Sequence, residues 1–324
     1  MQVTPQEPYR RRLGWCVFTF LIAASLAHAQ SNPQPTVEVA TTVAFLEGPT
    51  SDAAGNVYFS DMVNQRILKL SAEGMLSVFR ENSNVANGLL IDPQGRLIAC
   101  EGAVFERPGI RLRGTPRVTR TDMVTGAVEV LAESYAGKPL VGPNDVTIDG
   151  KGRLFFTELN GGSVYRIDAP GKLVRILESP AVKSPNGIQI SPDDRTLYVV
   201  EAGRGATDRR EIRAFDLLPD GSVANGRTLY NFFPGRSADG ISIDVEGNVY
   251  ASAGMSTTRG TSETLDTKTG VYVISPTGRL LRFIPIAEDL ISNNGFGGPD
   301  MKTLFITAGK TLFKVKNDVA GLAR

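Results

Sequence analysis

Short runs of β-branched and aromatic residues, separated by turns rich in Asp and Gly, occur along most of this chain. Examples are NVYFS, RILKL, RLFFTE, TLYVVEA, NVYASA and GVYVIS. Runs of this length and composition predict β-strands. No stretch of ten or more residues shows the periodicity of an amphipathic helix. The pattern therefore predicts an all-β fold.

One short motif recurs six times, and we call its first residue the marker. The markers follow one another at intervals of about 40 to 57 residues. Five markers are followed by Gly and one by Asp145. A β-rich run opens ten residues after the marker, or eleven in one copy, behind a turn that usually reads Asp-x-x-Gly. The markers are Glu47, Asn87, Asn144, Asn186, Asp239 and Asn294.

Repeats of this length, each with several short strands, are typical of a β-propeller. We therefore expect six blades of four antiparallel strands. The last copy ends early, so Thr36–Leu46 is expected to supply its missing outer strand and close the ring. Because the innermost strand of every blade lines the central channel, the markers should meet at one mouth of it. We interpret the turn aspartates as structural; they are Asp52, Asp92, Asp149 and Asp244.

The N-terminus has a different pattern. Three arginines, residues 10–12, precede an apolar run that ends in Ala27-His28-Ala29. This order is typical of a secretory signal peptide, and the run is too short to favour a membrane-spanning helix. We predict a signal peptide over 1–29, a flexible leader over 30–35 and a single propeller domain over 36–324. A periplasmic or secreted protein without stable membrane insertion follows.

Composition narrows the chemistry. The formal net charge is +1 and no basic stripe is present, which argues against nucleic-acid binding. Removal of residues 1–29 takes the only His and one of the two Cys. The mature chain then has no internal disulfide, and neither Ser-His-Asp catalysis nor a His-ligated zinc site is available to it. The oligomeric state is left open.

The markers supply only carboxylate and amide oxygens. A ring of such oxygens suits one hard divalent cation, Ca²⁺ first, with Mg²⁺, Mn²⁺ or Zn²⁺ as alternatives. The competing interpretation is that Asn-Gly and Asp-Gly simply shape turns, as these dipeptides commonly do. Two features favour the ligand interpretation: the marker precedes a strand, and Glu47 has no turn preference.

The motifs resemble those of the SMP-30/gluconolactonase/LRE-like family. This resemblance implies a six-bladed propeller that hydrolyses lactones with one divalent metal ion in its channel. The segments that carry it cover most of the mature chain: EGPTSDAAGNVYFSD from Glu47, NGLLIDPQGRLIAC from Asn87, PNDVTIDGKGRLFFTE from Pro143, PNGIQISPDDRTLYVVEA from Pro185 and DGISIDVEGNVYASAG from Asp239.

The resemblance also implies roles for individual residues. Glu47, Asn186 and Asp239 would hold the metal ion, with Asn144 beside it or among its ligands. Asp239 would also be the catalytic general base. Asn87 and Asn144 would contact the substrate, a small-molecule lactone or ester.

The chain departs from the pattern of this family in two places, so its substrate and its function have alternatives. Gly142 stands where animal members of the family have an Arg. An insertion, AVFERPGIRLRGTP, follows Gly102; it either folds over a channel mouth, where Arg107, Arg111 and Arg113 would meet an anionic substrate, or is a solvated loop. Two other functions fit the same fold: a non-catalytic propeller that binds a sugar or a protein, and a phosphotriesterase-like hydrolase on the same metal site.

Overall fold

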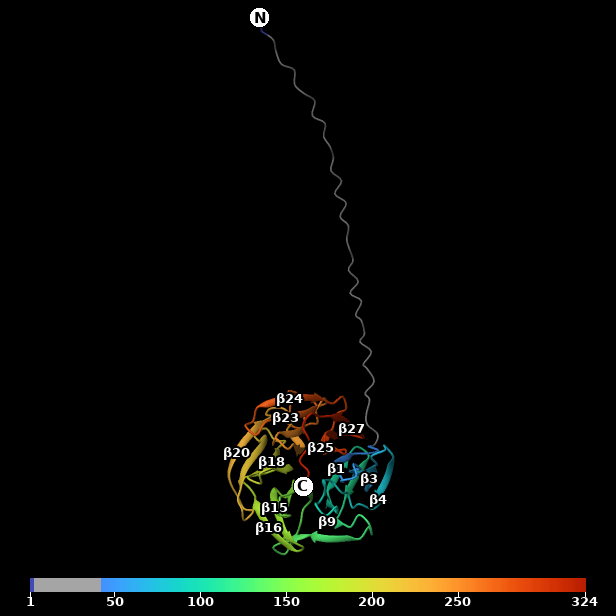
Figure 1. Ribbon diagram of the computed structural model, residues 1–324. Helices are drawn as coiled ribbons and strands as arrows, with labels where there is room; N and C mark the ends of the chain where they lie inside the picture. Colours follow the sequence, from blue (N-terminus) through green and yellow to red (C-terminus); the bar gives the residue numbers. More distant parts are fainter. Residues whose placement is uncertain (3–41) are drawn as a thin grey trace. The chain divides into compact units, whose positions relative to one another are not determined.

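Six antiparallel sheets stand around a central channel (Figure 1) in the computed structural model, which describes residues 1–2 and 42–324. In these residues every regular element is a strand, so the predicted all-β class and the six blades are confirmed. The described part of the chain contains no helix with the length and apolar character needed to cross a bilayer. The predicted signal peptide and leader lie outside the described residues and stay predictions.

Five sheets have four strands each, and strand order from the channel outward follows the chain. Blade 1 is β1 (Leu46–Ser51), β2 (Val57–Asp61), β3 (Arg66–Leu70) and β4 (Leu76–Arg80). Blade 2 is β5 (Leu89–Ile91), β6 (Leu97–Glu101), β9 (Arg117–Thr121) and β10 (Val128–Ala132). Blade 3 is β13 (Pro143–Ile148), β14 (Leu154–Glu158), β15 (Ser163–Ala169) and β16 (Lys172–Leu177).

The second half of the ring repeats this plan (Figure 1). Blade 4 is β17 (Pro185–Ile190), β18 (Thr196–Ala202), β19 (Arg210–Leu217) and β20 (Val223–Asn231). Blade 5 is β21 (Ala238–Ile243), β22 (Val249–Ala253), β23 (Gly270–Ile274) and β24 (Leu280–Pro285). Blade 6 is β25 (Ile291–Gly297), β26 (Thr303–Ala308) and β27 (Thr311–Lys316). Two hairpins are inserted between strands, β7 (Val104–Arg107) with β8 (Ile110–Arg113) and β11 (Ser134–Tyr135) with β12 (Lys138–Pro139).

The turn between the first two strands of a blade has the structural role that the sequence predicts. In blade 2, Asp92 accepts hydrogen bonds from the backbone N–H groups of Gln94 and Arg96 at 3.0 and 2.9 Å, and its second oxygen accepts from the Arg96 guanidinium at 2.8 Å. Gly95 has φ of 72°, a conformation that suits Gly. The second strands of four blades begin at the residues expected ten positions after the marker, Val57, Leu97, Leu154 and Val249.

The ring closes between the inner strands of blades 6 and 1. The Ser292 hydroxyl on β25 donates to the Leu46 carbonyl on β1 at 2.7 Å, and the Ser51 hydroxyl donates to the Phe296 carbonyl at 2.8 Å. Of the closing strand expected over 36–46, residues 36–41 lie outside the described residues. Its last residue, Leu46, is the first residue of β1, and residues 42–45 are not in a strand.

The C-terminal segment crosses from blade 6 toward the channel (Figure 1). The Leu322 N–H donates to the Ile243 carbonyl at 3.0 Å, at the end of β21. Arg324 then pairs with Asp194 and donates to the Ser191 carbonyl at 2.6 Å, in the turn after β17. These contacts lie at the C-terminal ends of the inner strands. The markers lie near the opposite ends of those strands, at the other mouth of the channel.

Candidate functional site

Four inner strands, β1, β13, β17 and β21, carry a β-bulge at the marker. On β13, Pro143 pairs with Glu158 and Val146 with Phe156, so Asn144 and Asp145 together oppose one residue of β14. The same irregularity lies between Pro185 and Ile188 on β17 and between Ala238 and Ile241 on β21. A bulge re-aims side chains at a strand end, which explains how successive markers can face one another across blade boundaries.

Close packing requires the Gly after the markers Asn186 and Asp239, which changes the interpretation of these Asn-Gly and Asp-Gly dipeptides. A Cβ added to Gly187 would lie 2.6 Å from the Asp239 carbonyl oxygen, and one added to Gly240 would lie 1.9 Å from Asn293 Oδ1. Neither glycine needs a positive φ. The adjacent inner strand approaches so closely that only Gly fits. A turn preference therefore does not account for these dipeptides.

A chain of side-chain hydrogen bonds joins four markers from four consecutive blades. Asn87 Nδ2 donates to Asn144 Oδ1 at 2.6 Å, Asn144 Nδ2 donates to Asn186 Oδ1, and Asn186 Nδ2 donates to Asp239 Oδ1 at 2.6 Å. Asn87, Asn144 and Asn186 are buried. The structure thus brings together four of the predicted site residues that are far apart in the chain.

Arg236 fixes the carboxylate at the end of this chain. Its Nη2 lies 2.5 Å from Asp239 Oδ2, and its Nη1 donates to the carbonyls of Gly254 and Ile291 at 3.1 and 3.0 Å. Both Asp239 oxygens therefore already accept hydrogen bonds. The guanidinium ties Asp239 to the connection before β21 and to the neighbouring blade.

Glu47, the marker of blade 1, lies near Asp239 and Asp145. We call these three carboxylates, together with Asn87, Asn144 and Asn186, the charged centre. Glu47 is buried, and burial together with the charges of Asp239 and Asp145 raises its pKa well above the usual value. Its Oε2 accepts one hydrogen bond, from the Gly48 N–H at 3.3 Å. The Gly48 N–H and the Asn293 side chain lower this pKa, but burial and the two negative charges raise it further, so a bound cation would favour the ionised carboxylate.

Asp145, the residue that replaces Gly after a marker, lies next to this centre. Burial and the charge of Asp239 raise its pKa to about 7, whereas the hydrogen bonds from Asn293 lower it. Those bonds, from Asn293 Nδ2 to Asp145 Oδ1 and Oδ2, measure 3.0 and 3.1 Å. Three acidic side chains, Glu47, Asp145 and Asp239, thus act on one another electrostatically.

Three residues of the site were not predicted: Asp145, Arg236 and Asn293. In blade 6 the sequence pattern designates Asn294 as the marker, but Asn293 occupies the site, whereas Asn294 bonds to Ser242 and Ser252 between blades. The bulge of β25 lies before Asn293, which shifts the register by one residue. In the sequence, the Asp at position 145, where the other repeats have Gly, could have indicated that Asp145 belongs to the site. No sequence feature indicated Arg236.

The donor set fits a hard cation. Within residues 42–324, no three His, Cys, Asp or Glu side chains form a cluster that could hold a metal ion on their own, so amide oxygens would have to contribute. Asn87 Oδ1 is buried and accepts no hydrogen bond from the described residues. Carboxylate and amide oxygens, without nitrogen or sulfur donors, are typical of Ca²⁺ sites.

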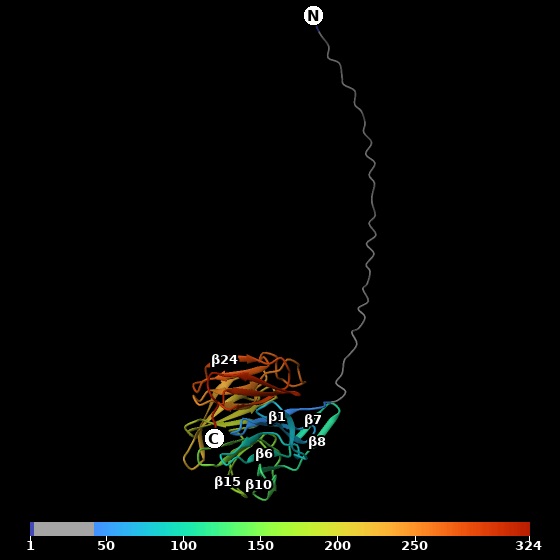
Figure 2. The same cartoon turned by 45° about the vertical axis from the view of Figure 1, so that its right-hand side comes forward.

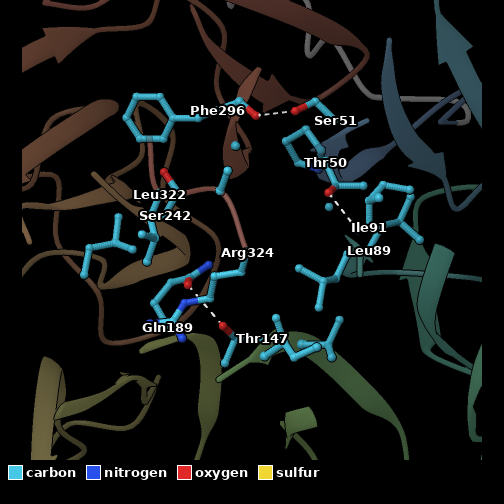
Figure 3. A pocket seen from close by; sticks show the side chains of 18 of the residues that line it. Thr50, Ser51, Leu89, Ile91, Thr147, Gln189, Ser242, Phe296, Leu322 and Arg324 are labelled. Atoms are coloured by element: carbon cyan, nitrogen blue, oxygen red, sulfur yellow. Dashed lines mark hydrogen bonds between the residues drawn. The ribbon is translucent and has the colours of Figure 1, made fainter. Parts of the chain in front are cut away.

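A cavity of about 490 Å³ lies between the inner strands (Figure 3). Asp145 and Asn293 lie at the marker end of its lining, and Arg324 from the C-terminal segment reaches into it. Its remaining wall is formed largely by inner-strand residues such as Leu89 and Ile91. The cavity therefore borders the charged centre through Asp145 and Asn293.

These features define a class of protein: a six-bladed propeller with an oxygen-donor centre at one mouth of its channel. The chain belongs to the SMP-30/gluconolactonase/LRE-like family, whose model matches residues 45–310.

Individual relatives agree with this assignment. The chain is 26% identical to a gluconolactonase from Zymomonas mobilis over 323 aligned residues, which cover 89% of this chain and 82% of that protein. It is 25% identical to the lactonase drp35 of Staphylococcus saprophyticus over 71% of each chain. The structure of a gluconolactonase from Xanthomonas campestris superposes with a TM-score of 0.68 at 28% identity, covering 87% of both chains.

Proposed function

We propose that this protein hydrolyses lactones with the help of one divalent cation, Ca²⁺ first, held by Glu47, Asn144, Asn186 and Asp239. The observation that carries the proposal is the convergence of two carboxylates and a chain of buried amides at one mouth of the channel. Mg²⁺, Mn²⁺ and Zn²⁺ are the alternative ions.

The enzyme class rests on the family. This protein is a lactonase, a carboxylic-ester hydrolase of the SMP-30/gluconolactonase/LRE-like family, because named relatives with this activity align with most of the chain. A small-molecule lactone is the corresponding substrate. When bound, the cation would polarise the lactone carbonyl and stabilise the oxyanion that forms on attack by water.

The side chains of this protein have separable roles in the proposal. Glu47 and Asp239 balance the charge of the cation. The hydrogen-bond chain from Asn87 to Asp239 fixes which edge of each amide is an oxygen, so the oxygens of Asn144 and Asn186 are oriented before binding. Arg236 holds Asp239 from the other side. Such preorganisation lowers the reorganisation needed during the reaction.

Asp239 is also the proposed general base, as the family resemblance implies. Its two oxygens accept hydrogen bonds from Asn186 and Arg236, an environment that favours the ligand role over proton abstraction. We therefore assign the cation-binding role to Asp239 first and the base role second. Asn87, whose Oδ1 has no hydrogen-bond partner among the described residues, is proposed to contact the substrate with Asn144.

Export is part of the proposal. The signal-peptide pattern over residues 1–29 supports a periplasmic or secreted enzyme. A pool of Ca²⁺ is more accessible in such a compartment than in the cytosol, which agrees with a hard-cation site of oxygen donors.

The test is a lactone panel assayed after chelation and then with Ca²⁺, Mg²⁺, Mn²⁺ or Zn²⁺ added singly. We expect ring opening to stop with the chelator and to return with one of these ions. Turnover that is unaffected by complete chelation would contradict the role of the cation. Binding of a cation without turnover of any lactone would contradict the role of the site in hydrolysis.

A further inference from the structure

The inserted hairpin β7–β8 is fixed to the ring rather than solvated. Phe105 is 4% exposed and packs in a cluster with Phe45, Met62 and Val85. Figure 2 shows the hairpin beside β1. Of its arginines, Arg111 and Arg113 are exposed, whereas the Arg107 guanidinium lies 5.2 Å from the ring centroids of both Phe45 and Phe105. Cation–π contacts of this kind hold Arg107 in place.

The topology places this hairpin at the marker mouth. An inner strand starts at that mouth, so the antiparallel second strand ends there, and connections from second to third strands lie on the same face. β7–β8 is such a connection in blade 2. Arg204 lies in the corresponding connection of blade 4 and Arg259 in that of blade 5. Arg236 precedes the marker of blade 5.

Four arginines from four connections therefore lie on the face of the ring that holds the charged centre, and Arg236 contacts it directly. Burial and repulsion from Arg204 and Arg236 lower the pKa of Arg107, opposed by Asp239 and Glu47. Burial and repulsion from Arg236, and weakly from Arg107, lower the pKa of Arg259. The packing agrees with these effects, because Leu290, the residue after the Asp289 that pairs with Arg259, packs on the same apolar cluster as the Phe45 and Phe105 rings that Arg107 contacts.

Nearby carboxylates balance the charges of these four arginines only in part. Arg236 pairs with Asp239, and Arg259 pairs with Asp289 at 3.3 Å. Neither Arg107 nor Arg204 forms an ion pair with any carboxylate in residues 42–324. Arg259 Nε is buried and donates to none of the described residues. With a divalent cation on Glu47 and Asp239, this mouth carries an excess of positive charge.

We propose that this mouth selects lactones that carry a carboxylate in addition to the ring ester, with Arg107 and Arg259 as the specificity-determining residues. The inference rests on the proposed function: Glu47 and Asp239 would hold the cation that orients the lactone carbonyl, and the arginines would bind the distal carboxylate. A planar guanidinium suits a carboxylate through two parallel hydrogen bonds. The surplus charge also steers anionic substrates toward the mouth.

The experiment compares D-glucono-1,4-lactone, which carries a hydroxymethyl group, with D-glucaro-1,4-lactone, which carries a carboxylate in the same position. We expect kcat/KM to favour the anionic lactone by about tenfold or more, the effect of one charge-assisted hydrogen-bonded contact. The preference should shrink as salt rises. Arg107→Gln and Arg259→Gln should each lower it severalfold, mainly through KM, and Arg107→Lys should restore part of it.

Arg111→Gln is the matched control, since Arg111 lies in the same hairpin but is exposed and 3.6 Å from Glu106. It should leave both lactones unaffected. Equal turnover of the two lactones, or a preference for the neutral one, would overturn the inference and leave the proposed function intact. If neither lactone is opened, calorimetry with glucarate and gluconate tests the selectivity. Tighter binding of glucarate that is lost in Arg107→Gln supports the inference, whereas equal binding of the two overturns it. Circular dichroism verifies that each variant folds.

Discussion

Asn186 donates its side-chain amide to Asp239 at 2.6 Å, a contact between residues 53 positions apart in the chain. Each is the second residue of the inner strand of its blade, and Gly187 allows the two strands to approach closely enough for the contact. The repeat places one polar residue at the same register position in each blade, and the ring brings these residues together so that their side chains form one hydrogen-bonded set. The chemistry of the site follows from the symmetry of the fold.

Replacement of Asp239 by Asn tests the centre directly. The variant keeps the shape but removes one of two carboxylates proposed to balance the cation and leaves Arg236 without its ion-pair partner. We expect the affinity for Ca²⁺ to fall about 100-fold or more, since even partners outside the ligand shell contribute 10–100-fold. Lactone turnover should be lost with it. Calorimetry and steady-state kinetics measure the two effects.

The control for this variant is Asp300→Asn, because Asp300 is half exposed and lies in the turn after β25, at the other end of the inner strand. It changes the net charge equally. Wild-type affinity in Asp239→Asn would show that the carboxylate is not a ligand.

Cation binding should also stabilise the folded protein. At a concentration 100 times the dissociation constant, a ligand specific for the native state adds about 2.7 kcal/mol, which corresponds to a rise in Tm of about 5 °C. The Glu47→Gln variant should lose most of this rise, because Glu47 is one of the two buried carboxylates proposed to bind the cation. Thermal unfolding with chelator and with added Ca²⁺ measures it. An equal shift in wild type and variant would place the ion elsewhere.

The sequence predicts those parts of the site that obey the repeat. Asn87, Asn144, Asn186 and Asp239 meet as expected because equivalent strand positions occupy equivalent places around a propeller. Asn293 was missed because the bulge of β25 lies between Ile291 and Asn293, before the position that the motif indicates, and bulge positions depend on pairing with the next strand.

Arg236 and Asp145 were missed for a different reason. Arg236 lies in a connection, where no periodicity constrains side-chain direction. The role of Asp145 depends on Asn293, a partner 148 positions away in the chain. Such contacts follow from tertiary packing and leave no local signal.

Gly240→Ala should damage the site without removing any functional group. The new Cβ would lie 1.9 Å from Asn293 Oδ1, so Asn293 must move and release its hydrogen bonds to Asp145. We expect a loss of roughly 1–3 kcal/mol in the free energy of unfolding, as overpacking commonly costs, together with weaker Ca²⁺ binding. Chemical denaturation and calorimetry measure the two.

Gly142→Ala is the matched control for this substitution. A Cβ on Gly142 meets nothing within 4 Å, φ is not positive, and the N–H that donates to Glu158 at 3.1 Å is retained. Stability and binding should match the wild type. If both variants behaved alike, close packing of the inner strands would not explain the glycines after the markers.

The pH dependence of stability in the metal-free protein should reflect the buried carboxyls. Burial, followed by the charge of Asp239, raises the pKa of Asp145 to about 7, and the pKa of Glu47 is raised as well. Between pH 4 and about 7 the folded state therefore binds more protons than the unfolded chain, so the free energy of unfolding should fall as pH rises. Thermal unfolding at pH 5 and 7.5, after removal of metal ions, measures this slope. Asp145→Asn should flatten it, and saturating Ca²⁺ should reverse it because the cation favours the ionised carboxylates. A slope of the opposite sign in the metal-free protein would show that these carboxyls remain ionised in the folded state.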